Sequence, residues 1–302
     1  MANQPTITSN YAGEFAGDYI SAAILSANTL ANNGVTILPN VKYKTTLKTV
    51  ASSGIVQNAT CDFTDVGVVT LSDKVLTVTE KQVNLQLCKT PFESDWEASQ
   101  MGFSAFDNLP TKFSDFFIGK MLKDIALDTE NFIWNPATGL QALLDADGAA
   151  QVPAPVAITA LNVIEKMGDL VDLIPPALYG REDLRIYVSQ NVAKAYVRTL
   201  GGFGAQGFGS NGIDSKGTQW YNNGALNFDG ISIFVANGLP ASNMVATTIE
   251  NLYFGTGLMD DQNLIKTIDM ADIDGSKNVR FIARFTRGLQ IGFGSDSARY
   301  TV

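Results

Sequence analysis

A glycine-rich hexapeptide is the first candidate for chemistry in this sequence. Gly202, Gly204 and Gly207 fit the pattern GxGxxG, with which nucleotide-binding proteins receive a pyrophosphate. That use needs a strand before the motif and a helix after it, so that the first amides of the helix meet the phosphates. Here a predicted helix over 190–200 precedes the glycines and a polar, glycine-rich stretch follows. We interpret 201–212 as a flexible loop at a hub between subunits, and keep nucleotide binding as an alternative.

A second candidate is a partial calcium loop near residue 272. Asp272, Asp274 and Gly275 follow the spacing of such a loop. Met270 stands where the first carboxylate belongs, however, and Phe281 where the closing glutamate belongs. We therefore predict a surface turn and no metal site.

The remaining side chains offer little to an enzyme. Asp145 and Asp147 form a carboxylate pair, but the sequence shows no second acidic cluster or basic partner for them, so we interpret them as solvated. The chain has no histidine, which excludes Ser-His-Asp, Cys-His and His-ligated zinc schemes. Cys61 and Cys88 form no CxxC unit and are predicted to be two free thiols. We predict no catalytic, cofactor-binding or metal-binding residue.

Composition indicates a protein that assembles with copies of itself. Charged residues make up 17% of the chain and hydrophobic residues 45%, whereas a soluble globular domain has about 25% charged residues. A subunit that buries much of its surface against neighbours needs fewer charges. The net charge is −9, and no Lys or Arg lies between Lys123 and Lys166 or between Lys216 and Lys266. The sequence therefore lacks the basic cluster of a nucleic-acid binder.

The N-terminal region shows no sign of a leader or a membrane span. Its first basic residue is Lys42, so the positive segment of a signal peptide is missing. The uncharged run from Tyr19 to Val41 contains too many polar and helix-breaking residues for a span. We expect a protein that is made in the cytosol and has no membrane partner.

The elements that would position these residues begin with an extended arm at 1–12 and a short amphipathic helix at 13–30. Strand patterns follow: over 41–49 apolar or β-branched residues alternate with Lys42, Lys44 and Lys48 on the other face. A turn at Ser52, Ser53 and Gly54 leads to a polar tip, and a return strand runs from Val66 through Leu85. We predict a long two-stranded arm that lies on a neighbouring subunit, since an isolated ribbon is marginal in water. An ordinary sheet of the same chain is the alternative.

The middle of the chain mixes helices and strands. An apolar stripe predicts a helix over 111–133, which ends before Pro136 and Gly139. Further patterns predict a helix near 157–170, a strand at 184–189 and a helix at 190–200. This alternation favours an α+β subdomain.

The last quarter of the chain reads as strands and turns. Short strands are predicted at Ile231–Val235 and at Leu252–Phe254. Alternation from Val279 to Phe293 predicts one long strand, interrupted at Gly288. Its polar positions include Arg280 and Arg284, and Arg287 directly precedes the glycine.

This closing segment resembles that of tailed-bacteriophage major capsid proteins, whose shell fold is shared with encapsulins. The shared pattern is a strand ending in a Leu239-Pro240 turn, the Phe254-Gly255-Thr256 element, an acidic linker and the long strand with Arg287-Gly288 near its middle. The resemblance implies an α+β fold with five parts. These are an N-terminal arm with a short helix (1–34), an extended β-hairpin loop (35–87), a peripheral domain with a long spine helix (88–140), an axial domain (141–260), and closing strands that return to the peripheral domain (261–302).

The resemblance also implies a function. Copies would assemble through hexamers and pentamers into an icosahedral phage head that encloses double-stranded DNA, built in the cytoplasm of a bacterial host. A separate scaffold, a portal, and decoration or cement proteins are the expected partners. Residues predicted to take part in assembly lie in the arm, in the glycine-rich loop and on the last long strand: Lys42, Lys44, Lys48, Ser52, Ser53, Gly54, Gly202, Gly204, Gly207, Arg280, Arg284 and Arg287. The alternatives are an encapsulin-type shell with a protein cargo, or a soluble enzyme that binds a nucleotide through Gly202–Gly207.

Overall fold

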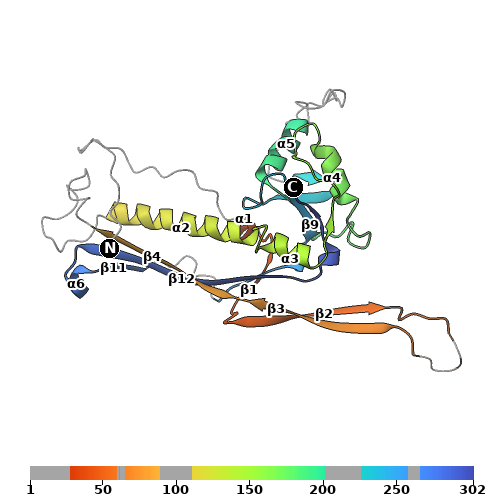
Figure 1. Ribbon diagram of the computed structural model, residues 1–302, viewed down its shortest axis with the longest axis horizontal. Coiled ribbons are helices and arrows are strands. Elements are labelled where there is room, and N and C mark those ends of the chain that lie inside the picture. The colour runs from red at the N-terminus through yellow and green to blue at the C-terminus, as the bar shows by residue number, and fades with distance from the viewer. Residues whose placement is uncertain (1–27, 60, 62–64, 89–110, 201–225, 258–265) are drawn as a thin grey trace. The chain divides into compact units, whose positions relative to one another are not determined.

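The computed structural model describes residues 28–59, 61, 65–88, 111–200, 226–257 and 266–302. The chain divides into two compact units (Figure 1). Unit 1 contains residues 79–128 and 256–287, and unit 2 contains residues 27–78, 129–255 and 288–302. Each unit is therefore assembled from segments that are far apart in the sequence.

Unit 1 is a three-stranded antiparallel sheet with a long helix on one face. The central strand is β12 (Asn278–Ile291), which pairs with β4 (Thr79–Cys88) on one side and β11 (Lys266–Asp269) on the other. A short helix, α6 (Ala271–Asp274), joins β11 to β12. The helix is α2 (Thr111–Ile133), which confirms the helix predicted over 111–133. The last residues of α2 and of β12 belong to unit 2.

Hydrophobic contacts hold α2 on this sheet. Met121 packs with Phe281 in one buried cluster, and one helical turn later Ile125 packs with Phe285 in another. These residues recur every four positions on the helix and every second position along the strand, as a helix stripe on a strand face requires. The alternate residues of β12 therefore point away from the helix.

Unit 2 contains a six-stranded mixed sheet in the order β5-β13-β9-β6-β8-β7. In chain order its strands are β5 (Ala150–Gln151), β6 (Leu184–Val188), β7 (Asn227–Phe228), β8 (Ile231–Val235), β9 (Met244–Thr248) and β13 (Ala298–Tyr300). The helices α4 (Val163–Val171) and α5 (Gln190–Leu200) pack in the same hydrophobic core. The strand and helix predicted at 184–189 and 190–200 are confirmed. The helix predicted near 157–170 begins later, at Val163.

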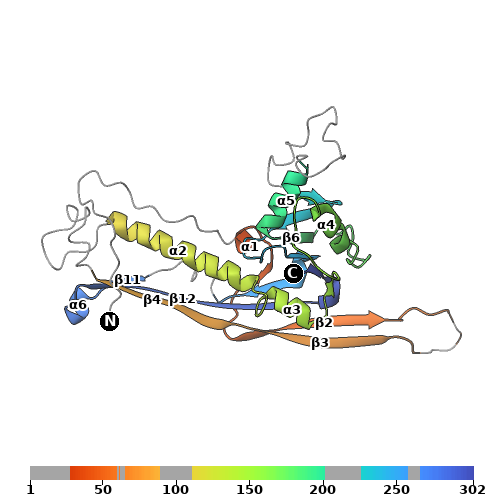
Figure 2. The same cartoon turned by 45° about the horizontal axis from the view of Figure 1, so that its top comes forward.

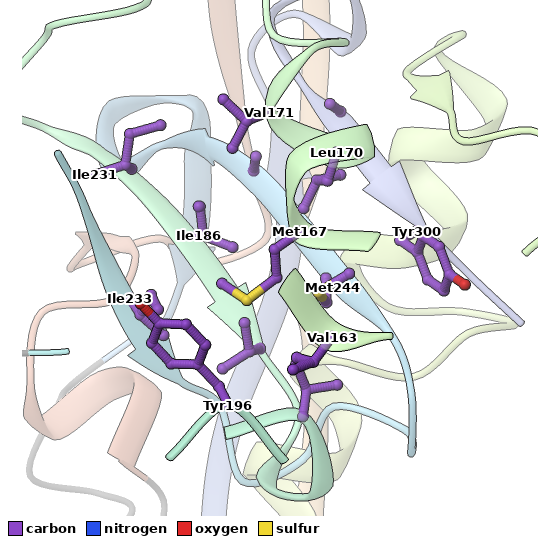
Figure 3. Close-up of a cluster of buried hydrophobic side chains, with 14 of the residues drawn as sticks. Val163, Met167, Leu170, Val171, Ile186, Tyr196, Ile231, Ile233, Met244 and Tyr300 are labelled. Atoms are coloured by element: carbon purple, nitrogen blue, oxygen red, sulfur yellow. The ribbon is translucent and has the colours of Figure 1, made fainter. Parts of the chain in front are cut away.

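The main core of unit 2 lies between α4 and this sheet. Figure 3 shows Val163, Met167 and Leu170 of α4 directed toward Ile186 and Met244 of the neighbouring strands β6 and β9. All five of these side chains are fully buried. The helix therefore contributes one apolar stripe to a close-packed layer.

A smaller layer of unit 2 joins segments from both ends of the chain. It contains α1 (Asn28–Ala31), β1 (Thr36–Leu38), α3 (Leu140–Ala146) and β10 (Leu252–Gly255), with the end of β12 and the 3₁₀ turns at Ile249–Asn251 and Gly294–Asp296. Its core holds Trp134 and Tyr187, whose ring centroids are 5.1 Å apart. Of the helix predicted over 13–30, residues 13–27 lie outside the described residues.

The last long strand is continuous, so the interruption predicted at Gly288 is wrong. Gly288 pairs with Gly255 of β10 inside the ladder. A Cβ atom at Gly288 would lie 2.3 Å from the carbonyl oxygen of Thr77. The glycine is therefore required by the close approach of another backbone segment, which a strand glycine also signals.

The return side of the arm is two strands where the sequence predicted one. The first, β3 (Val68–Thr77), pairs with β2 (Lys44–Ser53) in a two-stranded ribbon that is visible in Figure 2. The second, β4, leaves this ribbon and pairs with β12 through ten residues of unit 1. The two strands are separated at Val78, whose amide donates a hydrogen bond to the carbonyl of Tyr43 and whose side chain is buried. β3 (VVTLSDKVLT) is rich in Val and Thr, whereas β4 (TEKQVNLQLC) contains one of each.

Among the described helices, none is long and apolar enough to cross a membrane.

Candidate assembly surfaces

The hairpin, by which we mean residues 44–77, is attached near its base to the rest of unit 2. Lys74 Nζ lies 2.6 Å from a carboxylate oxygen of Asp147, which also accepts the amide of Gly294 at 2.5 Å. Gln290 Nε2 donates to the carbonyl of Val75 at 2.9 Å. The base is thus fixed by an ion pair and by a hydrogen bond from a side-chain amide to the backbone.

Asp145 and Asp147 are both exposed, as predicted, but each also has a basic partner that the sequence did not indicate. Asp147 binds Lys74, and Asp145 forms an ion pair with Arg299 near the end of the chain. The partners are 73 and 154 residues away along the sequence. A scan for nearby basic residues could therefore not find them.

The distal half of the hairpin exposes apolar side chains. Val50 lies opposite Leu71 and Ser52 lies opposite Val69, and residues paired in this way share one face of an antiparallel ribbon. The side chains of Val50, Val69 and Leu71 are 57%, 60% and 72% exposed. The opposite face at the base carries Leu76, which is fully buried. The ribbon therefore uses one face for its own unit and leaves an apolar patch on the other.

The tip continues this patch. Gly54 and Gly67 close the ribbon with positive φ angles of 64° and 95°, which glycine adopts without strain. Beyond them Ile55 and Val56 are exposed, Val56 to 88%. We call Val50, Ile55, Val56, Val66, Val69 and Leu71 the distal apolar patch; all six are exposed. Burying the three strand residues alone would contribute on the order of 3–6 kcal/mol.

The predicted hairpin residues lie on or near this face. Lys44 and Lys48 alternate with Thr46 on the patch side, and both are exposed, as is Lys42 before the strand. Ser52 and Ser53 belong to β2 and are not part of the turn, whereas Gly54 makes the bend that the sequence predicted.

The three predicted arginines of β12 divide by strand alternation. Arg280 and Arg284 are exposed on the face that points away from α2. Arg287 is buried, with Nη1 2.7 Å from a carboxylate oxygen of Asp128 on α2 and its guanidinium 5.8 Å from the ring centroid of Phe285. Arg287 therefore holds the helix on the sheet within unit 1, and Arg280 and Arg284 are available on the surface.

A buried carboxylate that the sequence did not single out organises the start of unit 2. Glu130 of α2 accepts the amide of Thr29 at 3.1 Å and its hydroxyl at 2.5 Å, and the amide of Gly238 at 3.4 Å. Trp134 Nε1 donates to the same hydroxyl at 2.8 Å. Glu130, Thr29 and Trp134 are all inaccessible to solvent. Burial raises the pKa of Glu130, and the hydrogen bonds from Thr29 and Gly238 oppose that rise.

The remaining chemical candidates do not form a reaction centre in the part of the chain that the structure describes. Gly202, Gly204 and Gly207 lie outside the described residues. Asp274 ends α6, and Gly275 follows with a positive φ of 71°, which confirms the surface turn. The described residues contain no cluster of three or more groups that could hold a metal ion. Cys61 is a free, exposed thiol, and no disulfide joins it to Cys88.

Comparison with known proteins identifies the fold. No protein-family model and no curated protein sequence matches this chain. A structure from Mycobacterium phage Che8 is 12% identical and superposes with a TM-score of 0.60, covering 98% of each chain. The capsid of a native GTA particle gives 11% identity and a TM-score of 0.63, covering 94% of this chain and 93% of its own. The capsid of Myoviridae phage XM1 is 13% identical and superposes with a TM-score of 0.58, covering 95% of this chain and 96% of its own. The predicted α+β fold of tailed-phage capsid proteins is thereby confirmed.

Proposed function

We propose that this protein is the major capsid protein of a tailed phage, whose copies assemble through hexamers and pentamers into an icosahedral shell around double-stranded DNA. The observation that carries the proposal is the match of nearly the whole chain to solved phage capsid structures. The match also runs over most of the matched structures, since at least 93% of each of the three matched chains is covered.

The distal apolar patch supports the same proposal on independent grounds. Exposed apolar surface on a ribbon is costly in water and is covered in a stable assembly. Because the base of the hairpin is held by Lys74 and Gln290, the distal half is displayed in a fixed register to a neighbouring copy. The hairpin is thus suited to lie across another subunit, as the predicted extended loop should.

The net charge of −9 suits a container for DNA. Like charges repel, so the shell holds a packaged genome without binding its sequence. A separate scaffold, a portal, and decoration or cement proteins complete the proposed set of partners, with assembly in the bacterial cytoplasm and a final place in the virion.

Electron microscopy of the purified chain, expressed alone, tests the proposal. We expect closed particles, tubes or flat hexamer sheets. Particles that hold a protein cargo when isolated from their native cells would favour the encapsulin alternative over the phage head. A monomer or small oligomer at all concentrations and salt conditions, with saturable nucleotide binding, would contradict a shell and favour the enzyme alternative.

A hairpin variant tests the role of the patch. Replacing residues 50–71 by an Asn-Gly turn joins the paired residues Thr49 and Ser72 with the connection that a two-residue hairpin prefers. Leu76 and Lys74, which fix the base, stay in place. We expect a folded, soluble subunit that forms no closed shell. A second variant with Val50, Val69 and Leu71 replaced by Thr keeps the ribbon and removes the strand residues of the distal apolar patch, and should also fail to form a closed shell.

A further inference from the structure

The short helix α1 is attached to unit 2 chiefly by hydrogen bonds. The side-chain amide of Asn28 donates to the carbonyl of Val235. Thr29 binds Glu130 of α2 through its amide at 3.1 Å and through its hydroxyl at 2.5 Å. Leu30 adds a partly buried apolar contact with the smaller core of unit 2. The position of α1 therefore depends strongly on the acceptor that Glu130 provides.

Glu130 is a buried carboxyl group that has hydrogen-bond donors around it and no cation. Solvent does not reach it, and within the described chain it forms no ion pair. Burial raises its pKa, hydrogen bonds from Thr29 and Gly238 oppose the rise, and no charged residue contributes. On its own helix, Asp128 is paired with Arg287. Ionised Glu130 is therefore stabilised by hydrogen bonds alone, and a buried charge without an opposite charge is costly.

The elements packed around this carboxyl group bring no compensating charge. α1 and residues 235–238 contain no titratable side chain. On β6, Tyr187 and Arg185 each donate to a backbone carbonyl of the turn that follows α1, at 2.5 and 3.2 Å, and burial raises the pKa of Tyr187. On α3, Asp145 is paired with Arg299. The titratable groups of these neighbours are thus bound to other partners.

The neutral form of Glu130 fits the same cluster. A proton on Oε1 can be donated to the hydroxyl oxygen of Thr29, 2.5 Å away. That oxygen has two lone pairs, so it still accepts the indole N–H of Trp134 at 2.8 Å. The amides of Thr29 and Gly238 keep the carboxyl oxygens as acceptors, at 3.1 and 3.4 Å. Protonation therefore removes the charge and keeps the contacts that bind α1.

The surroundings of α1 leave it space to move. Residues 31–33, which connect α1 to the buried Val35, are exposed. A hollow of about 410 Å³ adjoins α1, lined by Asn28, Asn32, Arg185 and part of β8. α1 can therefore move away from Glu130 while the six-stranded sheet stays intact.

We propose that Glu130 is a protonation-controlled latch, which holds α1 on unit 2 while it is neutral and releases α1 when it ionises. Release lets water hydrate the carboxylate and also exposes the indole of Trp134. In water the carboxyl group has its ordinary pKa of 4.5, whereas in the bound form it holds its proton more tightly. The equilibrium constant for release therefore rises as the pH increases above 4.5, by at most about tenfold per pH unit, and levels off above the raised pKa. This inference concerns the single subunit and does not depend on the proposed shell.

Hydrogen exchange of unassembled subunits tests the latch. The amides of Thr29, Asn32 and Gly34 are hydrogen-bonded within or next to α1, so their protection reports whether α1 is bound. After correction for the intrinsic effect of pH on exchange, we expect this protection to fall at least about threefold from about pH 5 to about pH 8. In Glu130→Gln the protection should not change with pH. Glu250→Gln is the matched control: it removes the same charge from an exposed position of unit 2 and should behave as wild type.

Exchange of the β6 amides in the same samples is the internal reference. If the protection of α1 is constant with pH in the wild-type chain, or falls equally in Glu130→Gln, the latch is wrong. If β6 loses protection in parallel with α1, the pH acts on the whole of unit 2, and the proposal is likewise overturned.

The fluorescence of Trp134 gives a second measurement of release. With Trp96 and Trp220 changed to Phe, Trp134 is the remaining tryptophan. Its quenching by acrylamide should increase over the same pH range and should stay constant when Glu130 is also changed to Gln. Quenching that does not change with pH while Glu130 is present would contradict release. If Glu130→Gln does not fold, the wild-type chain still decides the proposal, because release of α1 alone separates its exchange from that of β6.

Discussion

Replacing Thr29 by Val tests the buried carboxylate network at the start of unit 2. The substitution keeps the volume and the β-branched shape of the side chain and removes only the hydroxyl. That hydroxyl donates to Glu130 and accepts from the indole N–H of Trp134. The variant therefore leaves two buried polar groups short of a partner.

The magnitude follows from these two losses. A buried donor left without an acceptor costs about 1–3 kcal/mol, and a hydrogen bond to a charged group contributes about 1.5–3 kcal/mol. No solvent reaches Thr29, Glu130 or Trp134, so water does not replace the missing hydroxyl without rearrangement. We expect Thr29→Val to lower the free energy of unfolding by about 3–5 kcal/mol. A domain has about 5–15 kcal/mol in total, so this is a large fraction of its stability.

Urea unfolding of unassembled subunits, followed by circular dichroism, measures the effect. Thr29→Ser is the control, because it keeps the hydroxyl and loses only a methyl group, at a cost of about 1 kcal/mol. The serine variant should therefore lie close to wild type and the valine variant well below it. Equal stability of the two variants would refute the reasoning, since the hydroxyl would then contribute nothing that a methyl group cannot replace.

Three further changes probe the packing and the charge of the subunit. Gly288→Ala should lower the free energy of unfolding by about 1–3 kcal/mol, because the added Cβ would meet the Thr77 carbonyl. Gly119→Ala is the control: a Cβ there has no atom within 4 Å, so the variant should raise the free energy of unfolding by about 0.5–1 kcal/mol. Shifts of the melting temperature with the same sign for both variants would contradict this. Met167→Ala empties a fully buried site and should cost about 2–5 kcal/mol, against less than about 1.5 kcal/mol for Met167→Leu, in chemical unfolding. Glu130 holds its proton more tightly in the folded than in the unfolded chain, so its contribution to stability is complete below pH 4.5 and is lost as the pH rises through the raised value. The difference in free energy of unfolding between wild type and Glu130→Gln should therefore decrease as the pH rises through that range, by at most about 1.4 kcal/mol per pH unit. A difference that does not change with pH would show that the pKa of the carboxyl is not raised.

Periodic patterns in the sequence predicted the helices and strands that bury one continuous face. The stripe containing Met121 and Ile125 predicted α2, and strict alternation from Val279 to Phe285 predicted most of β12. Both patterns arise because a helix or strand with one buried face must repeat its apolar residues at a fixed interval. Contacts that depend on distant segments were not accessible in this way. Gly288 was interpreted as an interruption because nothing near it in the sequence pointed to Thr77, and nothing near Asp147 pointed to Lys74.

Two of the expectations that failed share a physical cause. The interruption at Gly288 and the single return strand through Val78 were both inferred from residues next to each other in the sequence. In the structure the backbone of Thr77 and Val78 lies against Gly288, whose Cβ would come within 3.0 Å of Val78 Cα. A strand boundary at Val78 and an unbroken strand at Gly288 are therefore two results of one close contact. Local propensity decides neither, because tertiary packing overrides it.

The low charge content of the chain is not spread evenly, and its location strengthens the case for assembly. Residues 50–71 contain only two charged side chains, Asp62 and Asp65, while seven large apolar residues there are exposed. Unit 2 carries a second group of exposed apolar side chains before and within α4, where Leu161 is 83% exposed and Val156 and Ile164 are about half exposed. A lone soluble subunit gains nothing from apolar surface concentrated in this way, and scattered residues would be the expected pattern. Two separate apolar surfaces, one on an extended hairpin and one on the body of unit 2, allow each copy to contact more than one neighbour, and a closed shell requires contacts of that kind.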